Sequence, residues 1–157
     1  MKAKTIATTL ALWLLAGAVS QASPHIGTWK LNEAKSKFTP GVAKNNTVTY
    51  EAVGDKVKVT VDGVDAEGKP THNEWTGKFD GKDYPVTGDP TSDMRSYKTM
   101  NSHSMGMTVK KGEKVVATGE VVVAKDGKSR TVTISGTTPE GKKFHNVAVY
   151  DKQYDKQ

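Results

Sequence analysis

Apolar and polar residues alternate along most of the chain beyond residue 23. The alternation is clearest at residues 47–50, 56–61, 74–76, 105–109, 131–134 and 146–150, where Val, Ile, Met, Tyr or Trp is separated by Thr, Lys, Glu or Asn. A period of two is typical of antiparallel strands that bury one face and expose the other. The pattern therefore predicts a succession of short strands, each with one apolar side.

Turn-forming dipeptides separate these segments at short intervals. Glycine supplies the positive φ of tight hairpin turns, and the Asp side chain bonds to the turn's own backbone. The predicted turns are Gly54-Asp55, Asp62-Gly63, Glu67-Gly68, Asp80-Gly81, Gly88-Asp89, Lys111-Gly112, Asp126-Gly127 and Glu140-Gly141. The spacing leaves no room for crossover helices. Only residues 32–38 have a helical pattern, with Asn32 as the cap and Pro40-Gly41 as the end.

Strands with one apolar face must roll up or stack to hide that face, and closure also removes exposed sheet edges. We therefore expect an all-β fold, an antiparallel up-and-down barrel of about eight to ten strands with one short helix near its N-terminus. A sandwich of two sheets is the alternative. Residues 23–157 have the length of a single domain.

Residues 1–22 have the three parts of a cleaved signal peptide. Lys2 and Lys4 precede an apolar run at residues 10–19, and Ser20 and Ala22 stand at positions −3 and −1 of a cut after Ala22. The run is too short to span a bilayer, and no comparable run follows. We expect an exported protein, periplasmic or secreted, with no integral membrane segment after cleavage.

Charge and cysteine content narrow the function classes. The formal charge is +6, and the leader contributes two of the positive charges. The lysines are spread along the chain beside Asp, Glu or Gly, which indicates a solvated surface. We therefore expect no nucleic-acid partner. We also expect the protein to be a monomer. The chain has no cysteine, so it has neither a disulfide nor a cysteine for a lipid anchor.

Gly27-Thr28-Trp29 resembles the Gly-x-Trp motif on the first strand of the calycins, the lipocalins and their barrel relatives. More closely, residues 27–38 and 146–153 resemble a group of exported bacterial proteins that are mostly uncharacterised. The resemblance implies a lipocalin-like barrel in which the Trp closes one end and a helical turn follows. It implies no activity. The glycine-rich continuation of haem-binding nitrobindin-like barrels is missing, so no haem ligand is carried over and no cofactor is expected.

A barrel of this size holds one small ligand, lined by the inward-facing residues of its strands. We therefore expect a non-enzymatic protein that binds a small apolar or amphipathic molecule. The alternatives are a core that these residues simply fill and a protein-interaction module such as a barrel-type inhibitor. The predicted ligand-binding residues are Trp29, Tyr50, Trp75, Tyr97, Met105 and Met107.

A second alternative is soft-metal binding. If His103 opens a strand, then His103, Met105 and Met107 are spaced by two and share one face. An imidazole with two thioethers is a ligand set that suits Cu(I) or Ag(I). Methionine is equally a flexible filler of cores, and a histidine near a turn is usually solvated.

Enzymatic motifs are missing from the sequence. It has no cysteine nucleophile, no Gly-x-Ser-x-Gly elbow, no His-Glu-x-x-His and no phosphate-binding loop. His72 and Glu74 could form an acid–base pair, and Asp62, Asp65 and Glu67 could form a loose cation site or a solvated hairpin. The sequence predicts that the protein is not an enzyme.

Overall fold

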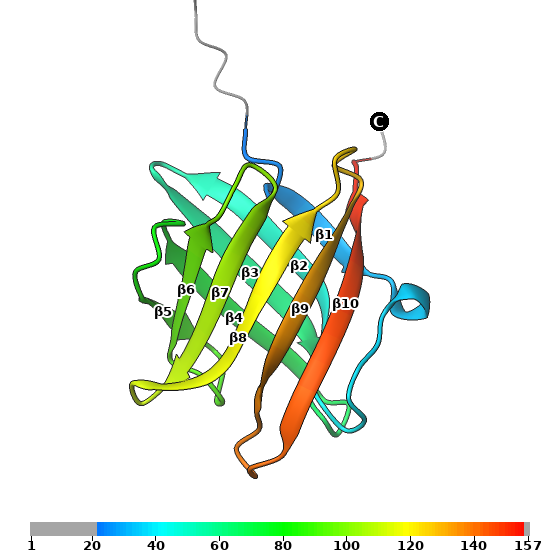
Figure 1. The fold of residues 1–157 in the computed structure, drawn as a ribbon, viewed down its shortest axis with the longest axis vertical. Helices are drawn as coiled ribbons and strands as arrows, with labels where there is room; N and C mark the ends of the chain where they lie inside the picture. Colours follow the sequence, from blue (N-terminus) through cyan, green and yellow to red (C-terminus); the bar gives the residue numbers. More distant parts are fainter. Residues whose placement is uncertain (1–21, 156–157) are drawn as a thin grey trace, which may run out of the picture.

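The computed structural model describes residues 22–155, and these residues form a closed barrel of ten antiparallel strands (Figure 1). The predicted signal peptide, apart from Ala22, lies outside the described residues. The strands are β1 (Gly27–Leu31), β2 (Lys44–Val53), β3 (Lys56–Val64), β4 (Pro70–Gly77), β5 (Tyr84–Thr87), β6 (Met94–Thr99), β7 (Ser104–Lys111), β8 (Lys114–Val123), β9 (Ser129–Thr137) and β10 (Lys143–Gln153).

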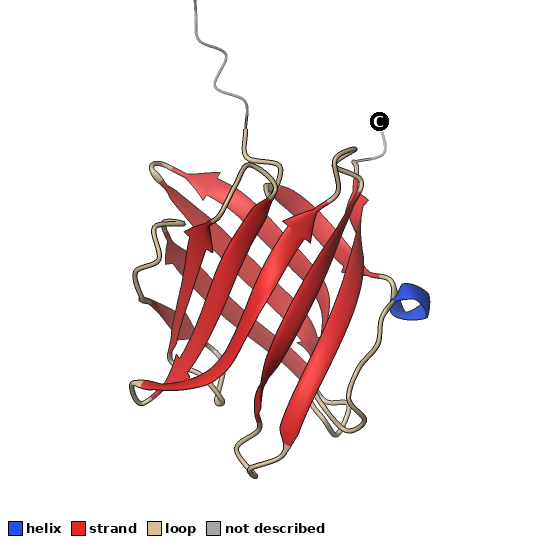
Figure 2. Cartoon of the chain, in the orientation of Figure 1, coloured by secondary structure: helices blue, strands red, loops and turns tan. Residues whose placement is uncertain are grey.

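Each strand pairs with its neighbours in sequence, and β1 closes the barrel by pairing with both β2 and β10. The register at the closure joins Thr28 to Thr49 on one side and to Gln153 on the other. The all-β, up-and-down prediction is confirmed, and the sandwich alternative is wrong. Figure 2 shows a wall made of strands, with the short helix lying outside it on the long connection from β1 to β2.

The connection from β1 to β2 contains a single helical turn, the 3-10 helix η1 (Glu33–Lys35). The Asn32 side chain accepts a hydrogen bond from the Lys35 N–H at 3.2 Å, as expected of a cap. The turn is shorter than residues 32–38 because Lys37 exchanges two 2.8 Å backbone hydrogen bonds with Val147 of β10. No helix among residues 22–155 is long and apolar enough to cross a bilayer.

The predicted turn at Asp62-Gly63 is wrong, because both residues lie within β3. The turn follows at residues 65–69, where the Asp65 carboxylate accepts the N–H groups of Glu67 and Lys69 at 2.9 and 2.8 Å. Gly63 is needed for another reason: a Cβ there would lie 2.1 Å from the carbonyl oxygen of Lys44. Glycine thus lets β2 and β3 approach at the irregularity in their register.

The barrel end that carries residues 22–26, called here the N-terminal end, is filled by aromatic side chains. Trp29 and Trp75 are at most 1% exposed. The indole N–H of Trp29 donates to the carbonyl of His25 at 2.9 Å, and that of Trp75 donates to the carbonyl of Arg95 at 2.8 Å. Phe79 stacks on Trp75, and Tyr97 meets its ring edge-on. These contacts leave the N-terminal half of the interior packed.

Strand β5 is the weakest part of the wall. It has four residues and pairs at two positions with β4 and at two with β6. One of its residues is Pro85, which has no N–H to contribute to a ladder. The β4–β5–β6 seam therefore has the fewest backbone contacts in the barrel.

Candidate functional site

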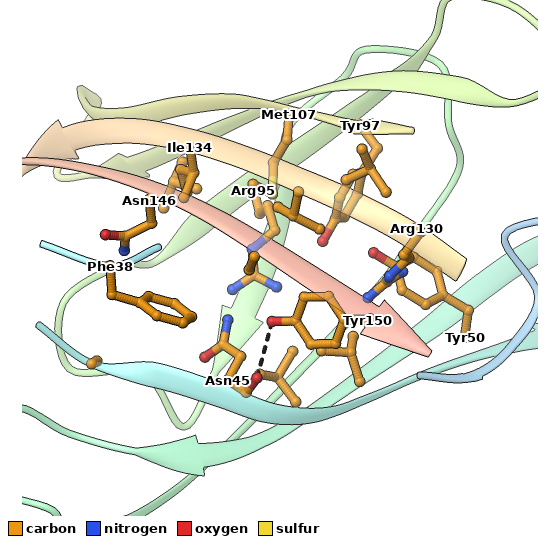
Figure 3. A pocket seen from close by; sticks show the side chains of 17 residues that line it. Phe38, Asn45, Tyr50, Arg95, Tyr97, Met107, Arg130, Ile134, Asn146 and Tyr150 are labelled. Carbon is orange, nitrogen blue, oxygen red and sulfur yellow. Dashed lines mark hydrogen bonds between the residues drawn. The ribbon is translucent and has the colours of Figure 1, made fainter. Parts of the chain in front are cut away.

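A cavity of about 120 Å³ lies inside the barrel, beyond the aromatic layer of the N-terminal end. Phe38 of the β1–β2 connection lines it on the side away from the aromatic layer (Figure 3), and Ala43 of the same connection also borders it. Most of its wall is apolar, because the strands turn alternate side chains inward. The apolar lining residues are Phe38, Ala43, Val48, Val61, Met107, Val109, Val121, Val132, Ile134 and Ala148.

Arg130, on β9, projects into this interior and is 2% exposed. Its guanidinium carbon lies 5.0 Å from the ring centre of Trp29, 4.7 Å from that of Tyr50 and 5.0 Å from that of Tyr150. The faces of aromatic rings attract a cation. Rings accept no strong hydrogen bond, however, and neither Nε nor Nη1 of Arg130 has a hydrogen-bond partner among the described residues.

Arg95, on β6, enters the same cavity and is 8% exposed. Its Nη2 donates to Asn73 Oδ1 at 3.3 Å, whereas its Nε has no partner within residues 22–155. Asp93 lies two residues earlier on the chain but forms no salt bridge with Arg95, and its Oδ2 accepts the N–H of Gly112 at 2.9 Å. None of the lining side chains is a carboxylate.

Three tyrosines and two asparagines, Asn45 and Asn146, complete the polar part of the wall. Burial raises the pKa of the Tyr150 hydroxyl to about 12, although Arg130 opposes the rise. Burial also raises the pKa of Tyr50, with Tyr97 adding to the effect and Arg130 again opposing it. Tyr150 donates to the carbonyl of Asn45 at 2.9 Å. The hydroxyls of Tyr50 and Tyr150 therefore stay protonated at neutral pH and remain hydrogen-bond donors.

The predicted ligand-binding residues divide into two groups. Tyr50, Tyr97 and Met107 line the cavity. Trp29, Trp75 and Met105 are at most 1% exposed and belong to the packed core around it. Trp29 nevertheless adjoins the site through its contact with Arg130.

Arg95 and Arg130 are not among the ligand-binding residues predicted from the sequence, although the distribution of arginine along the chain sets them apart. The chain has 23 lysine and arginine residues, and only these two are arginines. Both arginines face the interior. Arg95 lies two residues before Tyr97 on β6, and Arg130 lies two and four residues before Val132 and Ile134 on β9, so each shares the inward face of its strand with these residues. Arginine is thus restricted to two buried, core-facing positions, whereas no lysine of residues 22–155 is buried.

The proposed soft-metal residues do not line one cavity. Met105 and Met107 share the inward face of β7, and Met107 borders the interior cavity. His103 precedes the strand and borders a separate pocket at the N-terminal end. Across residues 22–155, no group of three or more His, Cys, Asp or Glu side chains is placed to hold a metal ion.

The pocket at the N-terminal end brings His25 beside Phe79 and His103. His25 is 4% exposed, and its Nδ1 has no hydrogen-bond partner in the described part of the chain. Burial is the main cause that lowers the pKa of His25 to about 4, and the positive charges of Arg130 and His103 add to it. His25 is therefore neutral at physiological pH.

His72 and Glu74 do come together, on the outer surface of the barrel. His72 Nδ1 lies 2.6 Å from Asp62 Oδ1, and Nε2 lies 3.5 Å from Glu74 Oε1. The hydrogen bond to Asp62 is the largest cause of the raised pKa of His72. All three side chains are more than 40% exposed, so this group is a solvated surface network. Asp65 and Glu67 do not join it, because Asp65 is occupied by its own turn.

Fold and cavity together define a closed ten-stranded barrel with a charged interior. No family model and no curated protein matches the chain. Among solved structures, it is similar to a redesigned β-barrel, mFAP1, bound to DFHBI, with 10% identity, a TM-score of 0.46, and coverage of 82% of this chain and 95% of that one. It is also similar to a de novo designed fluorescence-activating β-barrel, with 10% identity, a TM-score of 0.40, and coverage of 83% of this chain and 96% of the designed one.

Proposed function

We propose that this protein is an exported, non-enzymatic binding protein that holds a small amphipathic molecule inside its barrel. The observation that carries the proposal is the cavity of about 120 Å³, whose wall is mostly apolar and is polar at its tyrosines, asparagines and arginines. Sites for small molecules combine these two features, a mainly apolar lining and a few converging polar groups. The proposal assigns binding to the interior and no chemical step.

The ligand is small. A cavity of about 150 Å³ takes up one benzene molecule, so about 120 Å³ accepts a single ring or a short aliphatic chain. Because the interior is otherwise packed, a larger molecule would have to extend past Phe38 and Ala43 towards the end of the barrel opposite to residues 22–26.

Native mass spectrometry of the protein purified from its producing cells tests the proposal. We expect a bound organic mass on a chain that begins at Ser23, which would also establish cleavage of residues 1–22. A thermal-shift panel of small acids, alcohols, amides and aromatics then follows the melting temperature. A ligand at 100 times its dissociation constant stabilises the fold by about 2.7 kcal/mol, which gives a clear shift.

The matched control is a variant in which a larger side chain fills the cavity. Val132 lines it, and replacement by Phe places a ring in the space that the ligand would occupy. We expect Val132→Phe to keep the far-ultraviolet circular dichroism of the barrel and to lose the ligand-induced shift. The binding function would be refuted if the wild-type protein shows only the mass of its own chain and no compound changes its melting temperature.

A further inference from the structure

We propose that the ligand is an organic monocarboxylate whose head group is held by Arg95 and Arg130. This inference rests on the proposed function, because it names the chemical class that the same cavity accepts. It starts from the two buried guanidinium groups. Both line the interior cavity, and Figure 3 shows them among the side chains that surround it.

The two buried guanidinium groups have hydrogen-bond donors without partners. Nε of Arg95 and both Nε and Nη1 of Arg130 are buried and have no partner in residues 22–155. A buried polar group without a partner destabilises a protein, and a buried charge does so more strongly. Acceptors on a molecule in the cavity would therefore complete the hydrogen bonding of the two guanidinium groups.

The positive charges of the two arginines are not compensated by a carboxylate in the cavity wall. Two cationic side chains border a cavity whose lining includes no carboxylate, and no salt bridge of the described residues involves either arginine. A neutral acceptor would satisfy hydrogen bonds but would leave both positive charges uncompensated. A monoanion supplies acceptors and also compensates one of the two positive charges, and a hydrogen bond to an ionised partner is about twice as strong as a neutral one.

An organic carboxylate suits this cavity better than inorganic phosphate does. A carboxylate is planar and offers two oxygens with about four acceptor sites, which suits a few guanidinium N–H groups and a tyrosine hydroxyl. A phosphate dianion presents three strong acceptor oxygens and is polar all round. The remaining wall, formed by side chains such as Val109 and Ile134, instead suits an apolar body attached to the head group. We therefore take benzoate and hexanoate as probes.

The experiment compares each acid with its neutral counterpart. Benzoate, hexanoate, benzamide, hexanamide and inorganic phosphate are titrated into the protein by calorimetry after unfolding and refolding have removed any bound molecule. We expect the acids to bind about 10- to 100-fold more tightly than the amides, since this is the usual effect of hydrogen bonds to a charged group. Trp29 fluorescence should change as well, because its ring lies against Arg130.

Variants locate the site. Arg95→Met and Arg130→Met should each weaken benzoate binding by at least about 10-fold. Lys98→Met and Lys128→Met remove an exposed cation on or beside the same strands and should leave the affinity unchanged. The comparison of acid with amide uses the unaltered protein, so it decides the question even if a variant fails to fold.

The outcomes separate the two proposals. Equal affinity for acids and amides would overturn the carboxylate inference and leave the proposed function standing. Binding of inorganic phosphate without either acid would overturn the choice of carboxylate in favour of a polar anion. If none of the five probes binds and the purified protein carries a neutral molecule, the carboxylate inference is also overturned. If none of the five probes binds and the purified protein carries no bound molecule, both the carboxylate inference and the proposed binding function are refuted.

Discussion

Replacement of Arg130 by methionine should stabilise the empty barrel. The side chain is 2% exposed and two of its nitrogens have no hydrogen-bond partner among the described residues. Replacing buried ionic groups by apolar residues of similar volume is often neutral or stabilises a protein by about 1–4 kcal/mol. Most substitutions of a fully buried residue do the opposite.

Three aromatic contacts reduce the expected gain. Trp29, Tyr50 and Tyr150 each lie within 5.0 Å of the Arg130 guanidinium, and each such contact contributes about 0.5–1 kcal/mol. Methionine keeps part of this packing because its thioether also favours aromatic neighbours. We therefore expect a net gain of about 1 kcal/mol, which corresponds to a rise of about 3–5 °C in melting temperature for a domain of this size.

Urea denaturation of the refolded, ligand-free protein, followed by far-ultraviolet circular dichroism, measures the effect. Arg130→Lys is the comparison, because it keeps the buried charge and gives up the planar group that lies against the rings. We expect this variant to lose about 1 kcal/mol. A loss of more than about 2 kcal/mol in Arg130→Met would show that the guanidinium is already fully compensated in the empty barrel, and the reasoning above would be refuted.

Three further predictions concern stability and local opening. Because burial lowers the folded-state pKa of His25 to about 4, the unfolded chain binds more protons between pH 6.5 and 4. Stability should fall by about 2 kcal/mol as the pH drops through that range, and urea titrations of His25→Gln should show a flatter dependence. Trp29→Ala, which removes a fully buried ring, should cost about 3–5 kcal/mol in the same assay, and a loss below about 1 kcal/mol would contradict the packed N-terminal end. In native-state hydrogen exchange, the amides of β5 (Tyr84–Thr87) should exchange earlier than those of β9, since β5 has two ladder pairs on each side, and equal protection would contradict a weak seam.

Much of the barrel could be predicted from the sequence because its strands follow the inward and outward alternation of a closed wall. The segment 56–61, for example, lies in β3 with Val59 and Val61 buried. Strand β8 is harder to recognise. Its sequence opens with Val115 and Val116 in succession and ends in three valines, of which the central Val122 is 40% exposed. Apolar residues on both faces hide the period of two.

The site was harder to predict than the fold, because the residues that define it break the rule used to find strands. In an alternating segment, a cation is taken to face solvent. In β6 this rule assigns Arg95 to the outside, although Arg95 and Tyr97 are both buried. Tyr50 and Met107 were found because aromatic and thioether side chains are expected inside. Nothing in the sequence indicates which inward side chains leave a cavity, since this depends on how ten strands pack together.

The closure of the barrel between β1 and β10 has a consequence for folding. Its ladder joins Thr28 to Gln153, so the contact that completes the wall links positions at nearly opposite ends of the folded chain. Such long-range contacts raise the contact order, and proteins rich in them fold slowly because loop-closure entropy is lost before the contacts form. The hairpins from β2 to β9 involve only neighbours in sequence and can form earlier. Until the eleven residues of β10 are available, however, the sheet keeps two open edges. A chain cut short before residue 143 should therefore aggregate through those edges, β1 and β9, both of which pair with β10 in the closed barrel of residues 22–155.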